Sequence, residues 1–165
     1  MPPDAMPPEE PIRWLTADEL HAWRSFTLML YTLPAALEAQ LQNDARLSLL
    51  EYYVLAGLSE QKTHRMRMSE LARLASSELS RLSHLLKRLE KRGLVRREPD
   101  PADGRYTLAI LTDDGYAHLV ASAPGHVTRV RELVLAALDA AEFRALGESS
   151  AKIVERIESE RPGPA

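Results

Sequence analysis

Apolar residues recur at three- and four-residue intervals along most of this chain, a pattern that predicts a mainly helical protein. The clearest stripe predicts a helix over residues 80–92, because four leucines would share one of its faces. These leucines are Leu82, Leu85, Leu86 and Leu89. Gly93 follows the stripe and is expected to end the helix in the left-handed conformation.

A shorter helix is predicted immediately before this one. Ser69 would cap its first free N–H groups, and Leu71, Leu74 and Ala75 would form its buried side. Two helices separated by a few polar residues form a helix-turn-helix, which places its second helix in the major groove of DNA.

Beyond the second helix, the pattern changes to that of a hairpin. Proline, aspartate and glycine residues within 99–104 predict a turn, and Tyr106, Leu108 and Ile110 alternate along a returning strand. The expected fold class is therefore mainly α with a small β-hairpin wing. Residues 45–111 would form this winged helix-turn-helix, the DNA-binding lobe.

Two helices and a short strand are predicted before the helix-turn-helix. A capping box of Thr16 and Glu19 would open a helix that runs to about Gln42. A second helix covers about residues 48–59, and residues 65–68 could add a third strand to the wing.

Two more helices are predicted after the wing. The first follows Thr112 and is expected to bend or break near Pro124. The last opens with a capping box of Asp139 and Glu142 and ends near Ser159.

These terminal helices have more apolar surface than one small lobe could cover. We therefore expect residues 16–44 and 112–160 to form a homodimerisation region. The alternative is a monomer whose terminal helices cover one another. Residues 1–15 are expected to be a flexible N-terminal tail, and residues 161–165 a frayed end, because both are rich in proline.

The net charge of −3 hides an uneven distribution. Residues 62–105 hold twelve Lys and Arg against six Asp and Glu, a net +6, whereas the rest of the chain holds nine against eighteen, a net −9. A basic lobe of this kind is attracted to the phosphate backbone of DNA. The alternative is ordinary solvated charge on helix surfaces.

Composition also excludes several kinds of chemistry. Without cysteine the chain cannot form disulfides, thiolate metal sites or thiol-based peroxide sensors. The five histidines are scattered, so neither a metal site nor a cofactor is expected. An enzyme is not expected, because the sequence has no glycine-rich phosphate loop and no nucleophile–base arrangement. No apolar run approaches a membrane span and no signal peptide is recognisable, so we expect a cytoplasmic protein without a membrane partner.

The string RLEKRGLVRREPDPADGRYTLAILTDDG, residues 88–115, resembles the MarR family of bacterial transcriptional regulators. The family's wing has Asp-x-x-Asp-x-Arg, matched by Asp100, Asp103 and Arg105. The next helix starts with Leu-Thr-x-x-Gly, matched by the Leu111, Thr112 and Gly115 positions. Strings near Trp23, in residues 50–55 and in residues 123–127 resemble actinobacterial members, so the resemblance covers roughly residues 14–160.

This resemblance implies a homodimer that binds a two-fold symmetric double-stranded DNA operator, usually as a repressor. By position, base contacts are expected from Ser80, Arg81, Ser83 and His84, and phosphate contacts from Lys87 and Arg88. Arg105 would enter the minor groove, with Asp103 as its orienting partner. His84 stands where many members have arginine. For each basic residue, the alternative is a solvated surface charge.

The resemblance also implies an effector, a small aromatic or phenolic acid that releases DNA. Trp23, Phe26, Tyr52 and Tyr53 are candidates for lining its pocket, and His21 or Arg24 for binding its carboxylate. The alternative is that the aromatic residues belong to the core. A winged helix used only for protein contact is a further alternative to DNA binding; it would tolerate the loss of Arg81 and Arg105.

Overall fold

The computed structural model describes residues 12–160. The expected tails therefore lie outside the described residues over 1–11 and 161–165, and residues 12–16 precede the first helix without regular structure. Contacts divide the chain into two units, one that ends at Leu33 and one that begins at Pro34.

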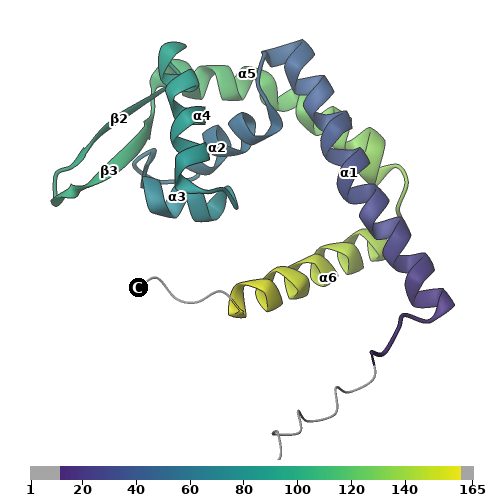
Figure 1. Ribbon diagram of the computed structural model, residues 1–165. Coiled ribbons are helices and arrows are strands. Elements are labelled where there is room, and N and C mark those ends of the chain that lie inside the picture. The colour runs from purple at the N-terminus through teal and green to yellow at the C-terminus, as the bar shows by residue number, and fades with distance from the viewer. Residues whose placement is uncertain (1–11, 161–165) are drawn as a thin grey trace, which may run out of the picture. The chain divides into compact units, whose positions relative to one another are not determined.

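Over the described residues, the chain is mainly helical with one small sheet (Figure 1). The elements in order are α1 (Ala17–Ala45), α2 (Leu49–Ser59), β1 (Arg65–Arg67), α3 (Met68–Leu74), α4 (Leu79–Lys91), β2 (Val95–Asp100), β3 (Asp103–Leu111), α5 (Asp113–Val130), a short π-helix (Arg131–Leu135) and α6 (Ala140–Ser159). The predicted fold class, helices with a β-hairpin wing, is confirmed. None of the described helices combines the length and hydropathy needed to span a membrane.

Three helices open with reciprocal caps. Thr16 and Glu19 exchange backbone-to-side-chain hydrogen bonds before α1, as predicted. Asp139 and Glu142 do the same before α6. At α2, Ser48 is the N-cap and Glu51 Oε2 accepts from the Ser48 N–H. These caps satisfy N–H groups that have no partner within the helix.

The start of α3 differs from the prediction. The helix begins at Met68, and its N-cap position is Arg67, which makes no side-chain capping bond. Strand β1 runs directly into α3, so Ser69 already lies inside the first turn and cannot serve as the N-cap.

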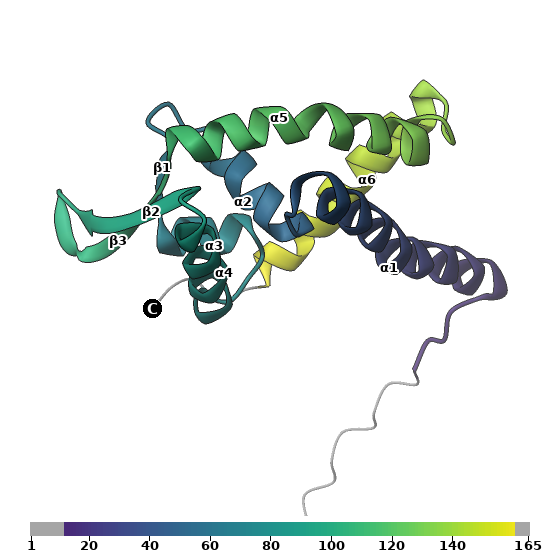
Figure 2. The ribbon, with the colours of Figure 1, turned by 90° about the horizontal axis from the view of Figure 1, so that it is seen from above.

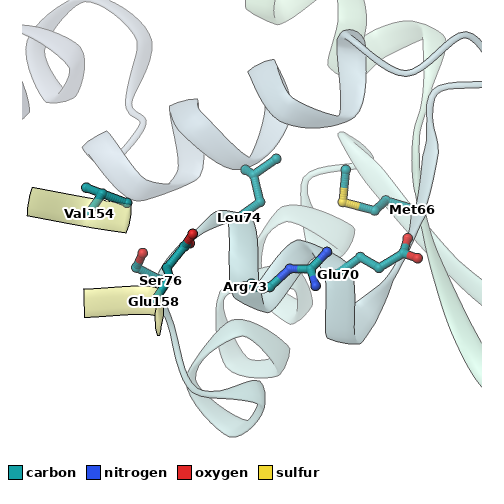
Figure 3. Close-up of a pocket in the computed structure, with 7 residues that line it drawn as sticks. All are labelled: Met66, Glu70, Arg73, Leu74, Ser76, Val154 and Glu158. Carbon is teal, nitrogen blue, oxygen red and sulfur yellow. The ribbon is translucent and has the colours of Figure 1, made fainter. Parts of the chain in front are cut away.

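The predicted burial of Leu74 is also wrong. Leu71 is fully buried, but 47% of Leu74 is exposed. The Leu74 side chain lies over Gly57 of α2 and lines a pocket of about 450 Å³ with Met66 and with Val154 of α6 (Figure 3). Gly57 permits this packing, because a Cβ there would lie 2.8 Å from Leu74.

Helix α4 and its end match the prediction. Its four leucines are buried, and Gly93 has a φ of +72°. The Gly93 N–H donates to the Glu90 carbonyl and the Leu94 N–H to the Leu89 carbonyl. This pair of bonds satisfies the last carbonyls of the helix and turns the chain into β2.

The sheet has the order β1-β3-β2, and all neighbours are antiparallel. The third strand is therefore confirmed, but the predicted alternation along β3 is not. Residues 108–111 are all buried, because the inner part of β3 lies between two strands and contacts α2 and α3. The outer part of the hairpin projects from the helices, and Tyr106 is exposed (Figure 1).

The start of α5 makes a tight contact with the segment that joins α4 to β2. Thr112 Oγ1 accepts from the Gly115 N–H at 3.0 Å and donates to the Gly93 carbonyl at 2.6 Å. A Cβ on Gly115 would lie 1.9 Å from the Leu94 carbonyl oxygen. The Leu-Thr-x-x-Gly string thus positions the start of α5 against the end of α4.

Helix α5 runs past α2 without the predicted break near Pro124 (Figure 2). Pro124 and Val120, whose carbonyl loses its helical donor, are both exposed, so solvent can replace the missing bond. The irregularity comes later, in the π-helix Arg131–Leu135.

Candidate nucleic-acid interface

Helix α4 separates an apolar face from a polar face. The leucine face closes the core, where the largest fully buried side chains come from several elements, among them the C-terminal part of α1. They are Leu41, Leu47, Val54, Leu55, Leu58, Leu71, Leu82, Leu86 and Leu89. The opposite face of α4 exposes Ser80, Arg81, His84, Lys87 and Arg88. Burial of one face therefore forces five of the predicted contact residues toward solvent together.

Four of these side chains line one groove. Ser80, Arg81, His84 and Arg88 border a hollow of about 600 Å³ with Glu38, Ser48, Leu50 and Leu85. Within residues 12–160, Arg81 and Lys87 have no ion-pair partner. Their charges are therefore available to an external anion.

Arg88 is held by a carboxylate that sequence reasoning missed. Arg88 Nε lies 3.2 Å from Glu51 Oε1, while Oε2 of the same carboxylate accepts from the Ser48 N–H. Glu51 is buried, whereas most of the Arg88 side chain is exposed. Glu51 thus connects the cap of α2 to the exposed face of α4. The capping pattern of Ser48 and Glu51 was visible in the sequence, but the partner 37 residues later was not.

Ser83 has a different environment from the other predicted base contacts. It is half-buried, and Arg97 of β2 donates a hydrogen bond to its hydroxyl at 3.0 Å. The same arginine pairs with Glu90, also on α4. Arg97 was not predicted, because no local pattern distinguishes it from its exposed neighbour Arg96.

The wing carries Arg105 beside Asp103, as the predicted pairing requires. Arg105 Nε lies 3.0 Å from Asp103 Oδ1, and Nη2 lies 2.7 Å from Oδ2. The side-chain hydrogen bonds from Arg105 hold the pKa of the Asp103 carboxyl below its usual value. Asp103 therefore stays ionised and keeps the guanidinium in one orientation.

A second arginine braces the hairpin near its turn. Arg67 of β1 donates from Nε to Asp100 Oδ2 at 2.8 Å, and its guanidinium lies 4.3 Å from the centre of the Tyr106 ring. The Ala102 N–H also binds Asp100, and this bond, followed by that of Arg67, lowers the pKa of the Asp100 carboxyl. Charge pairing and a cation–π contact thus connect β1 to both strands of the hairpin.

A hollow of about 400 Å³ lies between α4 and the hairpin, and we call it the wing groove. It is lined by Arg67, Met68, Ser69, Leu79, Ser83, Arg97, Arg105, Tyr106 and Thr107. Ser83 of α4 and Arg105 of the wing therefore border one open, arginine-rich space.

The candidate effector residues fall into two groups. His21, Trp23, Arg24 and Phe26 lie in the unit that ends at Leu33, where the Trp23 and Phe26 ring centres are 6.0 Å apart and His21 and Arg24 are exposed.

The second group, Tyr52 and Tyr53, lies on α2. Tyr52 is buried and Tyr53 half exposed, and burial raises the pKa of both hydroxyls. Sequence reasoning missed His126 of α5, whose ring centre is 4.4 Å from that of Tyr52. His126 is buried, its Nδ1 has no hydrogen-bond partner among the described residues, and burial lowers its pKa.

Among residues 12–160, no group of three or more His, Asp or Glu side chains is placed to hold a metal ion. The polar groups of α4 and the wing include arginines, Lys87, serine hydroxyls, His84 and the carboxylates that pair with the arginines.

Sequence comparison supports a regulatory family. The MarR family model matches residues 47–107. The Escherichia coli transcriptional regulator HosA is 46% identical over 54 residues, which are 33% of this chain and 40% of the HosA chain. The matched segment thus spans less than half of that relative.

Solved structures extend the match to nearly the whole chain. One of them is Sco3205, a MarR family transcriptional regulator from Streptomyces coelicolor that was solved in complex with DNA. Its sequence is 44% identical to this one, and it superposes with a TM-score of 0.86. The match covers 93% of this chain and 95% of the Sco3205 chain. AbsC, another MarR family regulator from the same organism, is 36% identical, with a TM-score of 0.85 over 90% of this chain and 100% of its own. The chain therefore belongs to the MarR family of transcriptional regulators.

Proposed function

We propose that this protein is a sequence-specific DNA-binding repressor that acts as a homodimer on a pseudo-palindromic operator. The observation that carries the proposal is the wing groove, which Ser83 of α4 and Arg105 of the wing both line. A helix that presents polar and basic side chains beside an arginine-bearing hairpin suits simultaneous contact with a major groove and the adjacent minor groove.

Each predicted residue has a role in this proposal. Ser80, Arg81, Ser83 and His84 contact base edges, and the guanidinium of Arg81, which has no ion-pair partner within residues 12–160, suits two-pronged binding to guanine. Lys87 and Arg88 bind phosphates, since they lie further along α4. Arg105 enters the minor groove, where a narrow width concentrates negative potential.

Exposed apolar side chains support the homodimer. On α6, Phe143, Ile153, Val154 and Ile157 are each between 44% and 54% exposed. On α1, Trp23, Leu28, Leu30 and Tyr31 are also exposed. Apolar stretches of this kind on two helices are typical of subunit interfaces. We propose that residues 16–44 and 112–160 bury them against a second copy, which would place two α4 helices about 34 Å apart, one turn of DNA.

An aromatic or phenolic acid is the proposed effector, acting by favouring a spacing of the two α4 helices that does not fit DNA. The half-exposed Tyr53 and the aromatic pair of Trp23 and Phe26 offer ring surfaces, and His21 and Arg24 are exposed enough to bind a carboxylate. A panel of phenolic and aromatic acids should contain at least one that raises the melting temperature and releases DNA. A panel without such a compound would contradict this part of the proposal.

Selection of bound sequences from random duplex DNA tests the function itself. The protein should enrich a two-fold symmetric site with half-sites one helical turn apart, and its affinity should fall steeply with salt. Sedimentation at micromolar concentration should show a dimer. Failure to enrich any sequence would contradict specific binding, and a stable monomer would contradict the symmetric arrangement.

A further inference from the structure

The hydroxyl of Ser83 is held by an arginine from the wing. Arg97 Nη1 donates to Ser83 Oγ at 3.0 Å, while Nε and Nη2 of the same guanidinium donate to Glu90 Oε2 at 3.0 and 2.6 Å. Ser83 and Glu90 are seven residues apart on α4, two turns along one face. Arg97 is therefore fixed on α4 at two points, and its charge is offset by Glu90.

This arrangement restricts what the Ser83 hydroxyl can do. A serine hydroxyl normally rotates and can donate one hydrogen bond and accept up to two. Beside a guanidinium that already donates to it, its proton must point away from that cation. The neighbouring charge also polarises the O–H bond, which strengthens it as a donor and weakens the remaining lone pair as an acceptor.

The Ser83 proton has no acceptor among residues 12–160, where the only hydrogen bond of this hydroxyl is the one it accepts from Arg97. Ser83 nevertheless lines the open wing groove together with Arg105 and Tyr106. A polarised donor thus remains unused beside the space that the proposed function assigns to DNA.

We propose that Arg97 makes Ser83 a preferential hydrogen-bond donor toward DNA, so that Ser83 favours a base with an acceptor on its major-groove edge. This inference rests on the proposed function. Guanine N7 and O6, adenine N7 and thymine O4 would accept the proton, whereas cytosine presents its amino donor there. Cytosine at this position would leave the Ser83 proton without an acceptor, and its amino group could donate only to the weakened second lone pair of Ser83 Oγ. Arg97 is then a positioning residue for specificity.

The alternative role for Arg97 is purely structural: fastening the wing to α4. That role predicts that loss of Arg97 weakens binding to all sequences alike. A specificity role predicts a change at one base pair in each half-site, so the two roles differ in the pattern of base preference rather than in affinity.

The test is a base-substitution scan of one half-site of the selected operator, with dissociation constants measured at fixed salt. Wild-type protein should disfavour cytosine about tenfold at one position. Ser83→Ala should lose this discrimination at that position only. Arg97→Met, which keeps the length of the side chain but none of its donors, should reduce it to about two- to threefold with Ser83 intact. Full discrimination in Arg97→Met, or an equal loss at every position, would overturn the inference.

Arg96→Met is the matched control, because Arg96 is the exposed neighbour on β2 and pairs with Glu98 instead of with α4. It should leave the preference at this position unchanged. If Arg97→Met does not fold, as judged by circular dichroism, Ser83→Ala decides alone: unchanged discrimination against cytosine would overturn the inference. Wild-type protein without any base preference would instead contradict the proposed function.

Discussion

Asp103 fixes the direction of Arg105 while leaving it open to solvent. Both carboxylate oxygens bind the guanidinium, yet 84% of the Arg105 side chain is exposed. Ion pairs between exposed groups contribute little to folding, because water and salt screen them. The pair therefore matters for orientation, because it presents a cation on the projecting hairpin in a restricted geometry.

Replacement of Arg105 should weaken operator binding without unfolding the protein. Arg105→Ala should cost about 1–3 kcal/mol of binding free energy, since it removes the side chain proposed to enter the minor groove. Gel shift or fluorescence anisotropy measures the loss, and circular dichroism checks the fold. Arg13→Ala, exposed before α1 and outside the proposed DNA-binding and dimerisation regions, is the control and should bind normally. Wild-type affinity in Arg105→Ala would rule out the wing contact.

Replacement of Asp103 should separate two effects of this residue on DNA binding: the orientation of Arg105 and the negative charge of its own carboxylate. Asp103→Ala removes a negative charge near the proposed DNA surface, so affinity for scrambled duplex should stay equal or rise. Affinity for the selected operator should fall about three- to tenfold, because Arg105 must then be ordered on binding. The ratio of the two dissociation constants is the quantity to measure. An unchanged or higher ratio would show that Asp103 does not orient Arg105.

Gly115 should not tolerate a side chain. A Cβ would lie 1.9 Å from the Leu94 carbonyl oxygen, so Gly115→Ala must displace the start of α5 from the end of α4. We expect a loss of about 1–3 kcal/mol in the free energy of unfolding, measured by urea denaturation. Gly147→Ala is the matched control: its Cβ meets nothing within 4 Å inside α6, and it should be neutral or stabilising by up to about 1 kcal/mol. Equal stability of the two variants would contradict the close contact.

Stability should fall as the pH drops below about 6.5, in part through His126. Burial lowers the pKa of His126 from its ordinary value of 6.5, so the unfolded chain takes up a proton at a higher pH than the folded protein does. Protonation therefore favours unfolding as the pH falls from 6.5 toward the lower pKa of the folded state. His126→Phe keeps a ring against Tyr52 but cannot be protonated.

Melting temperatures between pH 7.5 and 5 test this expectation. The loss of stability toward pH 5 should be smaller in His126→Phe than in the wild type. The Asp100 and Asp103 carboxyls, whose pKa values are lowered, contribute stability that is lost only on acidification toward and below their ordinary value of 3.8. An identical pH profile in both proteins would show that His126 is not responsible.

Local patterns predicted the elements that depend on neighbours in sequence. The leucine stripe of α4, the αL cap at Gly93 and the capping boxes at Thr16 and Asp139 each involve residues within a few positions, so the sequence alone was sufficient. Ser69 failed as a cap because a strand, rather than a loop, leads into α3.

The interactions that position the candidate site could not be predicted in this way. Arg88 binds Glu51 37 residues away, and Arg97 reaches Ser83 across 14 residues, so both depend on how α2, α4 and β2 pack. The burial of His126 could not be predicted from the sequence, since it follows from the contact of α5 with α2. The DNA contacts of α4 and the wing remain predictions, because the exposure of a side chain does not identify the base or phosphate that it binds.

The most direct test of DNA recognition by α4 and the wing compares binding to the selected operator and to a scrambled duplex at the same salt concentration. The variants are Arg81→Ala, Arg105→Ala and the double replacement. Each single change should reduce the preference for the operator about 5- to 150-fold, equivalent to about 1–3 kcal/mol, and the double variant should bind both duplexes almost equally. A double variant that keeps the wild-type preference for the operator would contradict the account.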